Sequence, residues 1–366
     1  MSLLKYKNNW KEAKENFDLW WNNEDIGRPI VKIIGTKGAD IWPVNIPTDY
    51  KDVHINAKFR FELYTKIFSN KVFYGEAFPF MDINMGPGSM AAYLDAEPVF
   101  DDSTVWYKEK AFGQISELGK LQFDSDNFWW KYHKSQVAEL VELAKNTDIM
   151  ATIPDILENI DIISLLRSPQ NLCYDLIDEP EIVEDYIKQI DDIYFKYYDE
   201  MYNLVKREDN SSSYTAFSIL SIGTTAKVQC DFSALMSPTQ FEQFIIPSLK
   251  KQCDRIDYTM YHLDGSDAVR HLDCIMTLEN LNALQWTPGA GKPDGGDEGW
   301  YSIYDKVKDA DKSLWISMDQ GGVDRFIEMS KKIVKRYGTK GIYFVYPTLD
   351  DIEAQKLFSY AEKGFK

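Results

Sequence analysis

Short apolar runs alternate with amphipathic stretches along most of the chain. Runs rich in β-branched and aromatic residues, closed by glycine, proline or aspartate, predict strands. These runs cover residues 29–35, 78–86, 149–156, 214–222, 227–235, 258–264, 282–287, 314–319 and 341–347. Apolar residues at helical spacing predict helices over 3–22, 51–69, 124–146, 158–167, 169–177, 180–207, 237–253, 267–278 and 323–336, with a last helix after residue 350. Residues 95–122 have no clear period and are interpreted as an excursion with a hairpin.

The order of these elements predicts the fold class. Alternating strands and helices favour a parallel sheet, and about eight strand–helix repeats favour an α/β protein that closes into a (β/α)8 TIM barrel. No linker rich in Pro, Gly or Ser and no block of charge divides the chain. We therefore predict one TIM-barrel domain over residues 1–366, with residues 1–28 as an N-terminal helical extension.

Polar residues recur at the predicted carboxyl ends of the strands, which is where such barrels carry their sites. These residues are Asp82, Asp155, Asp231, His262, Asp264, Gln285 and Asp319. The most informative stretch runs from Tyr258 to Gly265, because alternation along a strand places His262 and Asp264 on one face. An imidazole and a carboxylate are costly to bury without partners, so this pair indicates a functional site.

Asp82 stands out because it interrupts an apolar strand between Phe80 and Ile83. Two interpretations stay open: backbone amides satisfy the carboxylate, or burial raises its pKa. Of the many aromatic residues, Trp106, Trp286 and Tyr346 are candidates for lining an apolar pocket.

Charge and cysteine content restrict the class of protein. The net charge is −17, from 41 Lys and Arg against 58 Asp and Glu. Such a chain repels phosphate backbones and anionic lipid, so we expect no nucleic-acid or membrane partner. The four cysteines are scattered, and no apolar run has the length of a signal peptide or membrane span. We therefore expect a reduced, cytoplasmic protein; its oligomeric state stays open, a homodimer included.

Four stretches resemble the uroporphyrinogen decarboxylase-like superfamily. Phe80-Met81-Asp82-Ile83 is similar to the decarboxylase segment Phe-Ser-Asp-Ile, which supplies an essential aspartate. The stretch from Asp231 to Pro238 is similar to the superfamily's Ser-Pro-led helix, and His262-Leu263-Asp264-Gly265 to the His-x-Cys-Gly of its corrinoid-dependent methyltransferases. Residues 341–347 match the place of the last site loop. The resemblance covers nearly the whole chain and implies a TIM barrel.

The departures from that pattern concern the metal. In the methyltransferase branch, His-x-Cys and a distant Cys bind zinc, which activates a thiol to accept a methyl group. Here Asp264 stands in the first Cys position, and the strand over 341–347 has no Cys. His262 and Asp264 are acceptable ligands for a divalent metal, but the usual zinc–thiolate site is not available. The cofactor is thus unknown, with a divalent metal as one candidate. Porphyrinogen decarboxylation is disfavoured, because its substrate carries many carboxylates and this chain is strongly acidic.

The resemblance implies a methyltransferase-like enzyme for a small, methylated or cationic substrate. His262 is then a metal ligand or a general acid/base, Asp264 its partner or co-ligand, and Asp82 a carboxylate that binds or protonates the substrate. The residues expected to bind the substrate are Asp231, Gln285, Trp286, Asp319 and Tyr346. Any corrinoid would belong to a separate protein, because this chain has no room for a corrinoid domain.

Two alternatives remain from the sequence. A decarboxylase- or hydrolase-type barrel would use paired carboxylates at the strand ends, such as Asp82 and Asp231. A non-catalytic barrel that binds a small molecule would account for the missing cysteines.

Overall fold

The computed structural model describes residues 5–39, 45–111 and 113–366. Its strands are β1 (Ile30–Thr36), β2 (Lys71–Gly75), β3 (Phe80–Met81), β4 (Pro98–Phe100), β5 (Val105–Tyr107), β6 (Met150–Ala151), β7 (Ser211–Tyr214), β8 (Ile219–Ile222), β9 (Thr225–Gln229), β10 (Tyr258–Asp264), β11 (Ala283–Thr287), β12 (Ser313–Ser317) and β13 (Ile342–Asp350).

The α-helices are α1 (Trp10–Trp21), α2 (Tyr50–Ile55), α3 (Ala57–Phe68), α4 (Met90–Tyr93), α5 (Phe128–Ala144), α6 (Asn159–Arg167), α7 (Pro169–Asp178), α8 (Pro180–Val205), α9 (Pro238–Gln240), α10 (Ile246–Arg255), α11 (Leu272–Ile275), α12 (Tyr301–Asp309), α13 (Gly322–Tyr337) and α14 (Asp351–Ala361). Short 3-10 turns are η1 (Ile115–Leu118), η2 (Asp231–Leu235), η4 (Ala268–His271) and η5 (Glu298–Trp300), and η3 (Phe241–Ile245) is a π-helix.

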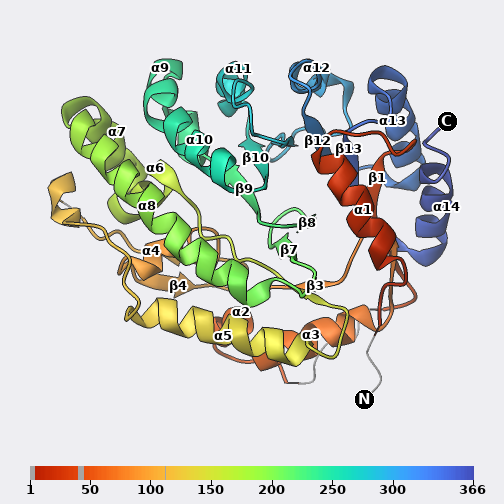
Figure 1. The fold of residues 1–366 in the computed structure, drawn as a ribbon, viewed down its shortest axis with the longest axis horizontal. Helices are drawn as coiled ribbons and strands as arrows, with labels where there is room; N and C mark the ends of the chain where they lie inside the picture. Colours follow the sequence, from red (N-terminus) through yellow and green to blue (C-terminus); the bar gives the residue numbers. More distant parts are fainter. Residues whose placement is uncertain (1–4, 40–44, 112) are drawn as a thin grey trace.

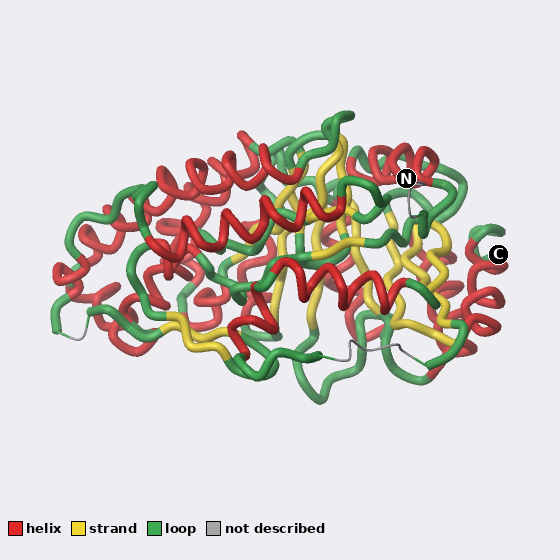
Figure 2. Tube along the Cα trace, turned by 90° about the horizontal axis from the view of Figure 1, so that it is seen from below, coloured by secondary structure: helices red, strands yellow, loops and turns green. Residues whose placement is uncertain are grey.

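The protein is a mixed α/β fold around a mostly parallel sheet. Seven strands pair in the order β2-β1-β13-β12-β11-β10-β9, and β2 alone among them is antiparallel to its neighbour. Helices α10 to α14 follow one another along the outer side of this sheet (Figure 1). Most of the strands gather in one half of the molecule, with helices on both sides of them (Figure 2).

Strands β3, β6 and β7 lie outside that sheet and associate with one another in parallel. β3 and β6 form a parallel pair, and a parallel bridge joins Ile153 to Tyr214 at the end of β7. In the described residues, the β3–β6 pair and the seven-stranded sheet are separate ladders. The sheet is confirmed as mostly parallel, and closure into a barrel stays a prediction.

Helix α1 covers the amino ends of several strands. Phe17 and Trp20 pack edge-on against Tyr343, with ring centroids 5.4 and 5.5 Å apart. Trp21 stacks on Tyr258, the first residue of β10, and its indole nitrogen donates to the Leu220 carbonyl at 2.8 Å. The helix predicted over 3–22 begins later than expected, at Trp10. Residues 3 and 4 of that prediction lie outside the described residues.

The strand predicted over 214–222 is wrong. The chain forms an antiparallel hairpin there, β7 and β8, joined through residues 215–218. Phe217 and Ser218 take the left-handed conformation, with φ of 66° and 52°, which is unfavourable for residues other than glycine. Their carbonyls accept hydrogen bonds from the Trp315 indole (2.9 Å) and the Tyr343 hydroxyl (3.0 Å). Contacts with β12 and β13 therefore hold a turn that has no local sequence signal.

Two other predicted strands are much shorter than expected. Residues 78–86 and 149–156 contribute only β3 and β6, two residues each. Pro79 and Pro154 flank these strands and cannot donate to a ladder. The helix predicted over 237–253 begins with a capping box of Ser237 and Gln240. The π-helix η3 precedes Pro247, so a wider turn accommodates the proline.

A buried histidine should make stability depend on pH. His133 on α5 is fully buried between the Tyr93 hydroxyl (2.7 Å) and the Ile83 carbonyl (3.0 Å), and burial lowers its pKa to about 4. In the unfolded chain the ring titrates near 6.5, so stability is fully present above that pH and is lost as the pH falls towards 4. We expect unfolding to become easier by about 2 kcal/mol between pH 7 and pH 5 from this group alone.

The measurement is urea unfolding at several pH values for the wild type and for His133→Gln. Glutamine can keep both hydrogen bonds but cannot take up a proton. Between pH 7 and pH 5, the free energy of unfolding of this variant should therefore fall by about 2 kcal/mol less than that of the wild type. Parallel slopes for the two proteins would contradict the assignment.

Candidate functional site at the end of strand β10

One row of side chains crosses the inner face of the sheet. The strand register aligns Gln229, His262, Gln285, Trp315 and Tyr343 on β9 to β13. Because neighbouring residues in register point to the same face, these side chains form one layer. Two residues further along β10, Asp264 points the same way and lies above that layer.

Three ligand-type residues converge above this row. Asp231, His262 and Asp264 each offer one donor atom, and the three donor atoms lie within 4.8 Å of one another. Both aspartates are exposed and the histidine is half-buried. Asp264 ends β10 and Asp231 opens η2, immediately after β9, so neighbouring strands deliver the group. We call these three residues the triad.

The orientation of His262 is fixed by the next strand. Its Nδ1 is hydrogen-bonded to the Gln285 amide oxygen, and the Gln285 amide nitrogen donates to the Thr287 hydroxyl at 2.8 Å. In this orientation Nδ1 carries the proton and the Nε2 lone pair is left for a ligand. Burial and the Lys227 ammonium lower the pKa of His262, against the Gln285 hydrogen bond and the two aspartates. The ring is therefore neutral at pH 7.

The carboxylates of the triad affect each other. Burial raises the pKa of Asp264, as does the nearby Asp231 carboxylate, while His262 acts in the opposite direction. Two like charges at this separation favour a cation or a shared proton between them. The triad can thus bind a metal ion or move a proton.

An aromatic ring borders the triad on one side. The Phe217 ring lies 4.9 Å from the His262 ring and 5.4 Å from Trp315, centroid to centroid. Phe217 belongs to the strained turn between β7 and β8. Strain of this kind persists where the surroundings enforce it, often beside a site.

A buried network of charges lies beneath the triad. The Lys227 ammonium is almost fully buried and donates to Asp155 at 2.7 Å and to the Gln229 amide oxygen. Glu158 accepts the backbone N–H of Gln229 at 2.6 Å, and burial raises its pKa well above the usual value.

Asp161 connects this network to the triad. Its carboxylate accepts the backbone N–H groups of Asp231 (2.8 Å) and Phe232 (2.9 Å). Burial, together with Asp231, raises the pKa of Asp161 to about 7. Asp161 therefore holds the start of η2, and with it Asp231, in place.

Asp82 lies in a second cluster, with side chains as its partners. Its carboxylate accepts hydrogen bonds from Arg60, Tyr64 (2.7 Å) and Thr215 (3.2 Å). Burial raises the pKa of Asp82, but Arg60 and these hydrogen bonds outweigh it, and the pKa lies below the usual value. Both interpretations from the sequence are thus corrected: side chains rather than backbone amides satisfy the group, and its pKa is not raised. An ionised Asp82 can bind a cation or a donor but has no proton to give.

The remaining predicted residues are placed as follows. Gln285 is buried and orients His262. Trp286 is buried on the opposite face of β11, 5.3 Å from the Trp300 ring. Tyr346 is buried and hydrogen-bonded to Ser330 of α13 at 2.6 Å. Asp319 is exposed, and its backbone N–H donates to Asp294. The structure brings Asp231, Gln285, His262 and Asp264 together and puts Trp286 and Tyr346 against the helices.

Sequence reasoning missed two charged residues beneath this site, Lys227 and Asp161. It also missed a charge elsewhere on the sheet, Lys32 on β1. The register pairs Lys32 with Val345, on the inner face, and burial lowers the pKa of its amine. A sequence signal for the two lysines was available, because each is a single charge inside a predicted apolar strand. A charge in such a place needs a partner or a function.

Known proteins provide a likeness in fold. No protein-family model matches the chain, and no curated protein matches it in sequence. Among solved structures, a methyltransferase from Methanosarcina mazei superposes with a TM-score of 0.64 at 11% sequence identity, over 97% of this chain and 99% of that one. The agreement over both full lengths establishes a shared fold. In the described part of the chain, no helix is both long and apolar enough to cross a membrane.

Proposed function

We propose that the protein is a methyltransferase-like enzyme with a divalent metal site, built on a (β/α)8 barrel of the uroporphyrinogen decarboxylase-like superfamily and related to its corrinoid-dependent branch. The observation that carries the proposal is the triad, where His262 and Asp264 occupy the His-x-Cys positions and Asp231 adds a third donor. The M. mazei methyltransferase, with a similar fold, supports the choice of reaction class.

The donor set fits a divalent cation. One imidazole and two carboxylates, with space for a further ligand, are typical of catalytic zinc, iron or manganese sites. The Gln285 hydrogen bond to Nδ1 leaves Nε2 to coordinate, which is the usual arrangement around a metal-bound histidine. A bound cation would supply Lewis-acid activation of a thiol or of water at the mouth of the sheet.

The protein's own residues would bind and orient a small substrate. Asp82, ionised and held by Arg60, can attract a cationic or methylated amine, and Phe217 offers an aromatic face beside His262. The methyl donor would be a corrinoid on a separate protein. We propose a cytoplasmic location, in keeping with the reduced cysteines.

The test is methyl transfer from free methylcobalamin to a small thiol, followed by the change in the corrinoid absorption spectrum. Protein loaded with Zn²⁺ or Mn²⁺ should accelerate demethylation, and chelator-treated protein or His262→Ala should not. No acceleration with any metal and several thiols, such as 2-mercaptoethanol and homocysteine, would remove the methyltransferase proposal.

One observation favours a second candidate, a hydrolase with paired carboxylates. The pair is Asp231 and Asp264, whose donor oxygens lie within 4.8 Å, and the pKa of Asp264 is raised. One carboxyl can then act as acid and the other as base or nucleophile. Hydrolysis of aryl glycosides that persists in chelator and is lost in both Asp231→Asn and Asp264→Asn would favour this reaction.

A further inference from the structure

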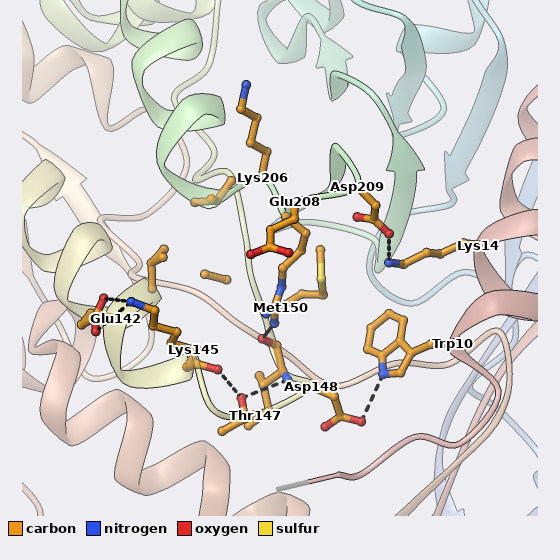
Figure 3. Close-up of a pocket in the computed structure, with 16 residues that line it drawn as sticks. Trp10, Lys14, Glu142, Lys145, Thr147, Asp148, Met150, Lys206, Glu208 and Asp209 are labelled. Carbon is orange, nitrogen blue, oxygen red and sulfur yellow. Dashed lines mark hydrogen bonds and ion pairs between the residues drawn. The ribbon is translucent and has the colours of Figure 1, made fainter. Parts of the chain in front are cut away.

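A cleft of about 720 Å³ lies at the amino end of β6, away from the triad. Its walls come from α1, the last turns of α5 and α8, and the segments that lead into β6 and β7 (Figure 3). The far end of β6 leads instead to Asp155 and the network beneath the triad. The volume is in the range of small-molecule sites. We call it the Arg207 cleft.

The floor of the Arg207 cleft is apolar and its rim is charged. The floor consists of Val141, Ala144, Ile149, Met150, Ala151 and Val205. On the rim, Lys14 pairs with Asp209 at 2.5 Å and Lys145 pairs with Glu142 at 3.4 Å. Asp148 accepts three N–H donors, from Tyr6, Lys7 and the Trp10 indole. Figure 3 shows the interactions of Lys14 with Asp209, Lys145 with Glu142 and Trp10 with Asp148, with Lys206 directed away from them.

Arg207 differs from the other arginines of the chain. Six of the eight form ion pairs with a carboxylate, namely Arg28, Arg60, Arg167, Arg255, Arg325 and Arg336. Among the described residues, Arg207 and Arg270 have no such pair; each donates to a backbone carbonyl, of Ile149 and Ala234 respectively. Arg270 is exposed and Arg207 half-buried. Within the described residues, Arg207 is thus the one arginine that combines a partly buried guanidinium with no carboxylate ion pair.

The two acids that act on the pKa of Arg207 are already engaged, and the cleft lining also contains Glu208. The carboxylates of Asp148 and Asp209 raise the pKa of Arg207, but burial outweighs them and lowers it. Asp148 has its three N–H donors, and Asp209 is bonded to Lys14 and to the Ser211 hydroxyl at 2.6 Å. A guanidinium presents five donors in a planar fork that matches a carboxylate. The free donors of Arg207 border an apolar cleft large enough for a ring system.

We propose that the Arg207 cleft binds a small organic monocarboxylate with an apolar or aromatic body. The carboxylate pairs with Arg207, and the hydrocarbon part lies on the apolar floor. A carboxylate gives the Arg207 guanidinium an ion-pair partner, while an uncharged molecule of the same shape leaves it without one. This site does not depend on the function proposed for the triad.

The test uses 2-naphthoate and its uncharged analogue 2-naphthamide with the full chain, by calorimetric titration. The wild type should bind the carboxylate at least about 10-fold more tightly than the amide, since a hydrogen-bonded charge pair is lost. Arg207→Gln, which can keep the bond to the Ile149 carbonyl, should weaken naphthoate binding by about 10-fold to 100-fold. Val141→Trp should block the cleft from α5.

Two further variants serve as controls. Arg270→Gln removes the other arginine that donates to a carbonyl and should bind naphthoate like the wild type, as should His262→Ala. Melting temperatures establish that each variant is folded. The proposal is overturned if naphthoate does not bind at millimolar concentration, if the amide binds equally well, if folded Arg207→Gln and Val141→Trp both bind normally, or if binding is lost in His262→Ala.

Discussion

Replacing His262 with alanine is expected to weaken Zn²⁺ or Mn²⁺ binding by more than about 100-fold. Loss of a hydrogen bond behind a metal ligand already costs about 10-fold to 100-fold, and loss of the ligand itself should cost more. Gln285→Leu should therefore fall between the wild type and His262→Ala, because it removes only the bond that orients Nδ1. Calorimetric titration of chelator-treated protein measures the affinities.

Asp264→Cys provides the sharpest version of this test. It introduces a sulfur at the end of β10, so Co²⁺ bound to this variant should show a thiolate-to-metal absorption band in the near ultraviolet that the wild type lacks. His54→Gln is the matched control, because His54 bonds the Asp101 carbonyl and is not part of the triad. The metal site is refuted if the wild type binds no divalent cation, or if His262→Ala binds one as tightly as the wild type does.

The part of the site that could be predicted from the sequence lies on single strands. Alternation along β10 is a local property, so His262 and Asp264 could be assigned to one face. Gln285 was also predicted at a strand end, and the strand register pairs it with His262. Asp231 was expected near them because it follows the neighbouring strand. The roles of these residues stay predictions, since side-chain proximity alone does not define a reaction.

The missed features depend on partners far apart in the chain. Phe217 and Ser218 carry no glycine or Asn-Gly signal, so the hairpin could not be predicted from residues 214–222 alone. Its carbonyls accept hydrogen bonds from Trp315 and Tyr343, which lie 98 and 125 positions later in the chain. In the same way, Arg60 on α3 determines the ionisation of Asp82. Tertiary contacts override local propensity at these points.

Removing the buried charge beneath the triad should be strongly destabilising. Lys227→Met should cost about 3–5 kcal/mol of unfolding free energy, because it leaves Asp155 without its cation in a buried setting. The ammonium is 2% exposed and Asp155 12%, so solvent cannot replace the partner. The Lys227 ammonium also lowers the pKa of the neighbouring Glu158, against the burial that raises it, so removing the ammonium makes Glu158 easier to protonate. Urea unfolding of the wild type and the variant measures the loss.

Two comparisons separate the ion pair from packing. The double variant Lys227→Met/Asp155→Asn removes both charges and should recover part of the stability lost in Lys227→Met. A double-mutant cycle then measures the interaction energy between the two residues. The surface pair of Lys356 and Asp324 is 46% and 84% exposed, and Lys356→Met should change stability by less than about 0.5 kcal/mol. Equal losses for Lys227→Met and Lys356→Met would mean that the network beneath the triad contributes nothing beyond an ordinary surface pair. A large loss confined to Lys227 would tie the stability of β9 to the buried charges beneath the triad.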